Sequence, residues 1–124
     1  IFAFDNWKYR RAMERKIELL SWRRDWQLKF YVYIDPEMAL SGHIRRVEWL
    51  RDHKCLPYIM RDQRCWGAEH EKFYTDYASW CNQPALFKKM TFPDFMERRY
   101  LSPSSALRVE KVLATYAGAS HALS

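Results

Sequence analysis

The feature that most constrains the fold is a short apolar strand followed by a polar turn and a helix-like segment, and this unit occurs three times. The strands cover residues 1–4, 28–34 and 56–60, and they run into polar turns at 5–6, 35–37 and 61–64. Because parallel neighbours need a crossover connection, the repetition predicts a parallel sheet. In such sheets and barrels, ligands sit at the carboxyl ends of the strands.

Apolar residues at helical spacing follow each of the first two turns. Asp5 or Asn6 is expected to be the N-cap of the first helix, which buries Met13 and Ile17. The second helix is expected to turn Ile44 and Leu50 inward. The residues predicted for its outer face are charged: Arg45, Arg46, Glu48 and Arg51.

A third helix places aromatic residues on one side and ends near Pro84, and beyond it the alternation stops. Short helical segments are expected at 84–89 and 92–100. Ser102 and Pro103 mark the start of a last helix, which Gly118 should stop, leaving 119–124 frayed. The predicted fold class is α/β, with repeated strand–helix units forming a partial parallel (β/α) barrel or an open parallel sheet, with extra C-terminal helices. Residues 1–100 would form the βα units and 101–124 the C-terminal helix and tail.

The second strand is apolar on both of its faces. Phe30, Val32 and Ile34 share one face, whereas Tyr31 and Tyr33 share the other. The aromatic residues of the second face predict that it too is covered by a helical layer. A three-stranded open sheet nevertheless has two unpaired edges and an uncovered apolar face. We therefore expect the isolated chain to self-associate, as a dimer.

The composition, with 48% hydrophobic residues, predicts a folded domain of 124 residues with a formal net charge of +6. No apolar run approaches the roughly 20 residues that span a bilayer, so no membrane partner is expected. The first residue is Ile1 rather than Met, which fits a truncated or processed product. Residues 1–66 hold 14 basic and nine acidic residues, so the basic excess lies in the first half. A solvated basic face is the favoured interpretation, and nucleic-acid binding is the alternative.

The cysteines and histidines form no recognised site. Cys55, Cys65 and Cys81 are odd in number, and their spacing matches neither a disulfide framework nor a metal site, which favours a reducing, cytoplasmic setting. Arg64 beside Cys65 would lower its thiol pKa, although a structural role is the favoured interpretation. The four histidines are scattered and are expected at the surface or at helix caps, and no metal site is predicted.

The strand-end turns carry the polar groups that could bind a ligand. They are Asp5, Asn6, Asp35, Arg61, Asp62 and Arg64. Carboxylates suit ribose hydroxyls or an amino group, and arginines suit a carboxylate or phosphate. The competing interpretation is that the Asp and Asn residues cap helices and that the arginines form surface salt bridges. A dinucleotide fingerprint, a phosphate-binding loop and a nucleophile elbow are all absent from the sequence.

Three segments resemble the later barrel units of radical S-adenosylmethionine (SAM) enzymes, in particular iron–sulfur oxidoreductase-like proteins of bacteria and their phages. They are Phe30-Tyr31-Val32-Tyr33-Ile34 with the following helix that contains Arg45-Arg46-Val47-Glu48-Trp49-Leu50, then Leu56-Pro57-Tyr58-Ile59-Met60-Arg61, and then Trp80-Cys81-Asn82-Gln83-Pro84-Ala85-Leu86-Phe87-Lys88-Lys89. The resemblance covers roughly residues 1–100. It rests on the order of the elements and on soft motifs.

The resemblance implies that this chain is the C-terminal part of an enzyme that cleaves SAM reductively at a [4Fe–4S] cluster to generate a radical. The family binds its cluster through a CxxxCxxC loop, which this sequence lacks, so the chain alone would bind no cofactor and be inactive. By matching position, the SAM pocket would be walled by Asp5, Asn6, Tyr33, Asp35, Arg61, Asp62 and Arg64. The substrate and the catalytic residues are not implied. The remaining alternatives are a basic aromatic nucleic-acid-binding module and a structural interaction domain.

Overall fold

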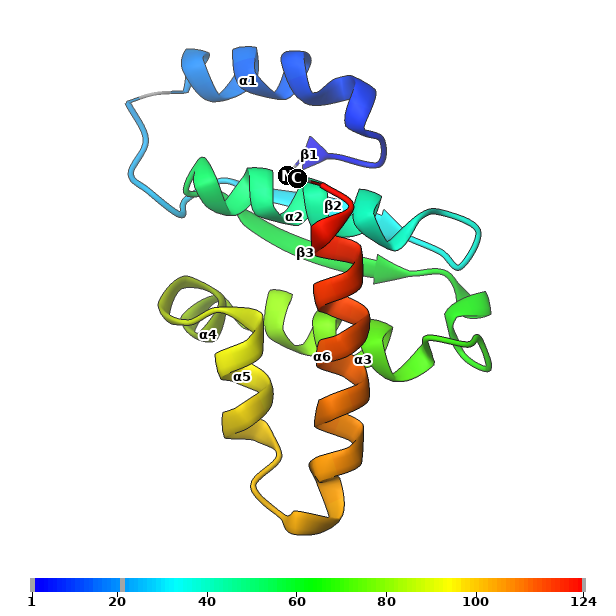
Figure 1. Cartoon of the computed structure of the whole chain (residues 1–124). Helices are drawn as coiled ribbons and strands as arrows, with labels where there is room; N and C mark the ends of the chain where they lie inside the picture. The colour runs from blue at the N-terminus through cyan, green and yellow to red at the C-terminus, as the bar shows by residue number, and fades with distance from the viewer. Residues whose placement is uncertain (1, 21, 124) are drawn as a thin grey trace.

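Three parallel strands and six α-helices make up the computed structural model, which describes residues 2–20 and 22–123. The strands are β1 (Phe2–Ala3), β2 (Lys29–Ile34) and β3 (Leu56–Arg61), and they pair in the order β1-β2-β3 (Figure 1). The predicted parallel α/β sheet is thereby confirmed. Ile1 of the predicted first strand and Ser124 of the predicted tail lie outside the described residues.

The helices follow the predicted order closely. They are α1 (Arg10–Leu19), α2 (Leu40–Asp52), α3 (Glu71–Cys81), α4 (Pro84–Lys89), α5 (Phe92–Arg99) and α6 (Ala106–His121). Short 3₁₀ turns precede α1 at Trp7–Tyr9, α3 at Gln63–Cys65 and α6 at Pro103–Ser105. The predicted stop at Gly118 is wrong, since α6 continues to His121. Gly118 does not adopt the left-handed conformation with which a glycine ends a helix.

One face of the sheet forms the centre of the core. Phe30, Val32 and Ile34 alternate along β2 and are fully buried, as are Val47 and Leu50 of α2, which packs on this face. Phe2 pairs with Phe30 in register and so lies on the same face, where Lys16 of α1 covers its ring at 4.7 Å. Both crossover helices therefore lie on one side of the sheet.

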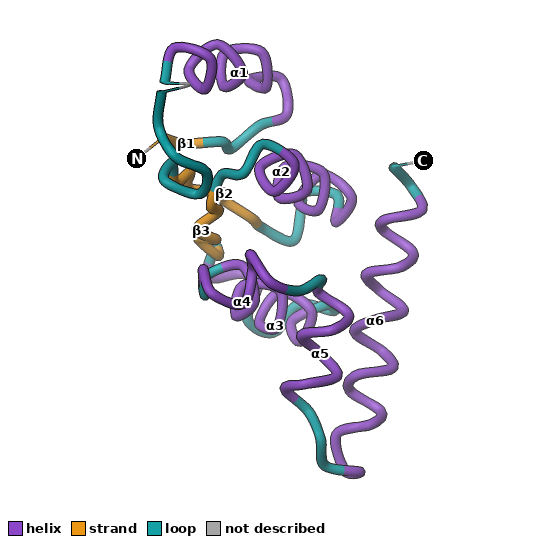
Figure 2. The backbone as a smooth tube through the Cα atoms, turned by 90° about the vertical axis from the view of Figure 1, so that its left-hand side faces the viewer, coloured by secondary structure: helices purple, strands orange, loops and turns teal. Residues whose placement is uncertain are grey.

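The opposite face of the sheet is bare, which contradicts the prediction of a second helical layer. Tyr31 and Tyr33 are only partly buried there, and Tyr58 and Met60 of β3 are 41% and 47% exposed. In Figure 2 the strands form a column with α2 on one side, α1 above the β1 end and α3 below the β3 end. The prediction failed because a tyrosine has a polar hydroxyl as well as an apolar ring, so it can line a sheet face that no second layer covers.

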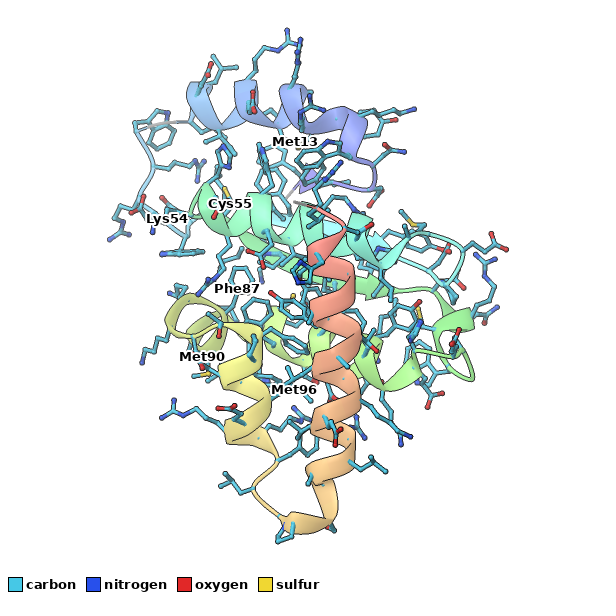
Figure 3. All side chains as sticks on the ribbon, viewed as in Figure 1. Met13, Lys54, Cys55, Phe87, Met90 and Met96 are labelled. Carbon is cyan, nitrogen blue, oxygen red and sulfur yellow. The ribbon has the colours of Figure 1, made fainter. Side chains whose placement is uncertain are left out.

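The last three helices, α4, α5 and α6, form an aromatic layer against α2 and α3. Phe87 of α4 packs 4.8 Å from Trp80 of α3, and Phe92 of α5 packs 5.1 Å from Tyr116 of α6 (Figure 3 shows Phe87 with the neighbouring Met90 and Met96). These centroid distances are typical of favourable aromatic pairs. The C-terminal helices are thus held to the sheet's helical layer through one continuous core.

A fully buried carboxylate joins three of these helices. Asp76 of α3 accepts two 3.0 Å hydrogen bonds from the Arg108 guanidinium of α6 and one of 2.5 Å from the Tyr100 hydroxyl that follows α5. A buried charge persists only when it is paired in this way. No helix in the described part of the chain has the length and hydropathy needed to cross a bilayer.

Two arginines that were predicted on the outer face of α2 point inward, which corrects the helical-wheel assignment. Arg46 is 1% exposed, and Arg51 donates to the main-chain oxygens of Phe87 and Met90 at 3.2 Å. The long side chains reach main-chain carbonyls, including that of Met90, which also accepts from Trp80 Nε1 at 3.2 Å. Arg45 and Glu48 lie on the same helix, with Arg45 stacked on Trp7 and Glu48 accepting from Tyr116.

Candidate ligand site at the carboxyl ends of the strands

Two side chains replace the backbone ladder where β1 separates from β2. The Asp5 carboxylate accepts the Tyr33 N–H at 3.3 Å, taking the place of a strand carbonyl. Arg46 donates from Nη1 to the carbonyls of Phe4 and Tyr33 at 3.0 and 2.9 Å. These contacts hold the carboxyl ends of the two strands apart without leaving their polar groups unpaired.

The buried Arg46 is joined to His43, one helical turn before it on α2. An Arg46 Nη2 donates to Nδ1 of His43 at 2.8 Å, so Nε2 carries the histidine proton and donates to the Asp35 carbonyl at 3.2 Å. Burial and the neighbouring guanidinium lower the His43 pKa to about 4. Burial likewise lowers the Arg46 pKa to about 10.

This pair was missed by the sequence interpretation, which placed His43 at the surface or at a helix cap and Arg46 on an outer face. Both residues are buried at the level where β1 and β2 end. The available signal was their i, i+3 spacing on the helix that directly follows the second strand-end turn. Their role is to hold the strand-end backbone in place, because both are buried and neither is exposed to a ligand.

Arg64 fastens the turn after β3 to the turn after β2. Its guanidinium contacts the carboxylates of Asp35 at 3.0 Å, Glu37 at 2.9 Å and Asp62 at 2.9 Å. Asp62 also accepts the Arg64 N–H, and Asp35 accepts the Glu37 N–H, so each turn is fixed locally as well. The arginine is half exposed, and its role is therefore to set loop geometry more than to stabilise the fold.

Tyr33 connects the bare sheet face to this arginine cluster. Its hydroxyl donates to Asp62 Oδ2 at 2.5 Å, from the side of the sheet that no helix covers. The hydrogen bond to Asp62 raises the pKa of Tyr33, and hydrogen bonds from Arg64 and Tyr33 hold the Asp62 pKa well below its usual range. Asp62 is therefore a carboxylate and Tyr33 a neutral phenol at physiological pH.

The structure brings together most, but not all, of the residues predicted for the site. Tyr33, Asp35, Asp62 and Arg64 form one connected cluster with Asp5 beside it. Arg61 lies apart: it stacks on Trp66 at 4.4 Å and donates to Thr75 of α3, on the helix-covered side.

Asn6 and Cys65 have structural contacts. Asn6 accepts the Lys8 N–H as an N-cap, which is the competing interpretation given for it above. Cys65 is buried under the third turn, and burial raises its thiol pKa. The expected lowering of the Cys65 pKa is therefore wrong, because desolvation and the carboxylate of Asp62 outweigh the nearby positive charge of Arg61.

The charge balance of the cluster favours a cationic or hydroxyl-rich ligand. Asp5, Asp35, Glu37 and Asp62 provide four carboxylates against the exposed guanidinium of Arg64 and the buried one of Arg46. Carboxylate oxygens accept hydrogen bonds from ammonium groups and from ribose hydroxyls. Among the described residues, no group of three or more His, Cys, Asp or Glu side chains is arranged to hold a metal ion.

Comparisons of the chain with protein-family models, with curated proteins and with solved structures gave no match.

Proposed function

We propose that this chain forms the C-terminal βα units of a radical SAM enzyme, in which the cluster of Tyr33, Asp35, Asp62 and Arg64 walls the SAM pocket. The observation that carries the proposal is the order of the strands and the position of the helices that connect them. Its strands follow in sequential order, both crossover helices lie on one face, and the other face is bare. This arrangement is expected of a barrel segment, whereas a doubly wound sheet has helices on both faces.

The position and charge of the cluster support a ligand of the SAM type. The residues lie at the carboxyl ends of parallel strands, the end at which barrel proteins bind their ligands. SAM carries a sulfonium, an ammonium and ribose hydroxyls, all of which favour carboxylate partners. Asp62 and Asp35 supply such oxygens, and Arg64 holds the two turns that carry them together.

The iron–sulfur cluster that the family uses does not fit this chain. Such clusters are held by cysteine thiolates. Cys55, Cys65 and Cys81 are buried free thiols, and burial raises the pKa of each of them. The cluster would be held elsewhere in the complete protein, and this chain alone would be inactive. Buried free thiols also support the reducing, cytoplasmic setting that we propose for the protein.

The test is SAM binding by the complete enzyme with single carboxylates neutralised. Asp62→Asn and Asp35→Asn should each weaken SAM binding about tenfold, the effect of one lost charge-assisted hydrogen bond. Asp52→Asn is the matched control, because this exposed aspartate lies at the C-terminus of α2 away from the cluster. Equilibrium dialysis with labelled SAM measures the affinity. Unchanged affinity in both cluster variants would refute the proposal.

The nucleic-acid-binding alternative stays a prediction. Its basic residues are spread over several helix faces and alternate with acids, and Arg10 of α1 and Arg45 of α2 both stack on Trp7, at 5.2 and 5.0 Å. These contacts already occupy the Trp7 indole, and Arg23 likewise stacks on the exposed Trp22 at 4.8 Å, so both rings are covered on one face by arginines of this chain. We therefore favour the enzyme proposal. Binding of a single-stranded oligonucleotide that weakens steeply with salt would reverse that preference.

A further inference from the structure

A basic cavity of about 270 Å³ lies where β2 and β3 begin, at the opposite end of the strands from the candidate ligand site. Its walls come from three separate parts of the chain: the loop before β2, the end of α2 with the loop before β3, and α4. The residues that line it are Trp26, Arg51, Asp52, Lys54 and Lys88. Three of these five side chains are cations and one is a carboxylate.

The positive charge of the cavity is not neutralised by the chain itself. In the described part of the chain, none of Arg51, Lys54 and Lys88 forms an ion pair. Arg51 donates from Nε and Nη2 to the carbonyls of Phe87 and Met90, both at 3.2 Å. These bonds fix the guanidinium against α4, and they leave the N–H groups of Nη1 for another acceptor.

The two loops that meet at the cavity are joined in an unusual backbone conformation. The φ angle is 66° at Trp26 and 57° at Lys54, in the left-handed region that residues with bulky side chains rarely adopt. The Trp26 N–H donates to the Lys54 carbonyl at 2.6 Å, and Lys54 Nζ lies 5.6 Å from the indole centroid. The indole in turn meets the Phe87 ring edge-on at 6.0 Å (Figure 3 labels Lys54 and Phe87). Such conformations gather at ligand sites in proteins.

Helix dipoles explain only part of this arrangement. Arg51 and Lys88 lie in the last turns of α2 and α4, where a positive charge is favourable. Lys89 meets the same requirement in α4, but it does not line the cavity. Lys54 belongs to neither helix, and the dipoles do not account for the backbone conformation that holds it beside the other two cations.

We propose that this cavity binds a phosphate group. The N–H groups of one arginine and two lysines suit the oxygens of a phosphate dianion, and three cations against one carboxylate leave two positive charges to match it. Pockets for whole ligands begin at about 300 Å³, so this cavity takes the phosphate and leaves the rest of a small molecule outside. The site is separate from the proposed SAM pocket and does not rest on the proposed function.

Isothermal titration calorimetry of this chain at about 0.15 M salt tests the proposal, because screening at that salt suppresses non-specific attraction. The probes are inorganic phosphate and adenosine monophosphate, with adenosine as the uncharged control. Lys88→Met and Lys54→Asn should each weaken phosphate binding about tenfold, the loss of one charge-assisted hydrogen bond. Asparagine tolerates the left-handed backbone at position 54, so the loop is kept. Asp52→Asn should strengthen binding, because it removes the one like charge.

Lys89→Met is the matched control, since it removes a neighbouring charge of the same helix from outside the cavity, and it should bind phosphate as the wild type does. Tighter binding of adenosine monophosphate would identify the ligand as a phosphate monoester, and tighter binding of inorganic phosphate would identify it as the free ion. Equal losses in Lys88→Met and Lys89→Met, adenosine binding as tight as that of its monophosphate, or no saturable binding of either phosphate probe would overturn the inference.

Discussion

His43 should make the stability of this protein depend on pH between about pH 4 and 6.5. In the folded chain its pKa is lowered from 6.5 to about 4 by burial and by Arg46. The other groups that face the ring are the carbonyl and carboxylate of Asp35 and the ring of Tyr74 at 6.3 Å. Because His43 is fully buried, solvent screening does not reduce this difference appreciably.

The sign follows from proton binding. Between pH 4 and 6.5 the unfolded chain binds a proton at His43 and the folded chain does not, so the free energy of unfolding rises with pH. This contribution is complete above pH 6.5 and is lost as the pH falls toward 4. A pKa difference of about 2.5, at about 1.4 kcal/mol for each pKa unit, amounts to about 3.5 kcal/mol.

Urea denaturation followed by tryptophan fluorescence, repeated at half-unit steps from pH 7.5 to 4, measures this dependence. The wild-type chain should lose stability with a maximum slope of about 1.4 kcal/mol per pH unit. His43→Gln should be less stable at pH 7.5 and have a much flatter profile. The matched control is His53→Gln, since His53 is exposed at the C-cap of the same helix. The reasoning fails if His43→Gln keeps the wild-type slope.

Two further predictions concern the helical layer and the thiols. Asp76→Ala should lower the free energy of unfolding by about 3 kcal/mol, because it leaves Arg108 and Tyr100 without their shared partner. The control is Asp94→Ala, at an exposed aspartate, which should lower it by under about 1 kcal/mol. Equal losses in urea titrations would show that the buried carboxylate is unimportant. The three cysteines should react with a thiol reagent at pH 8 at least about 100-fold more slowly in the folded chain than in the unfolded chain. All three are buried, and burial raises the Cys55 pKa to about 11. Rapid modification of any one cysteine in the folded chain would contradict its buried position.

The order and type of the elements could be predicted because they depend on local patterns. Alternation of apolar residues identified β2, and Pro84 and Ser102 marked helix boundaries that the structure has at the same places. The predictions were wrong where a long side chain reaches beyond its own helix face or where its polar end forms a hydrogen bond. Helical spacing assigns Arg46 to an outer face, and no periodicity shows that its guanidinium reaches two strand-end carbonyls.

The position of the candidate site could be predicted, but not which of its side chains bond to one another. That the carboxyl ends of parallel strands gather polar turns follows from topology, and so Asp35, Asp62 and Arg64 were expected near one another. The direction of Arg61 was not, because a residue at the end of a strand belongs to the face set by the register. Similarly, nothing in the sequence distinguishes Asn82 from an ordinary C-cap until its amide is seen against β3.

The last helix has a consequence for the way this chain folds during synthesis. α6 completes the environment of residues made much earlier: Tyr116 donates to Glu48, which lies 68 positions before it in the chain. Contacts so distant in sequence slow folding, and they form only after the final turn has left the ribosome. Until then the aromatic rings that α6 covers stay open to solvent. The nascent chain is therefore expected to need protection from aggregation until α6 has emerged.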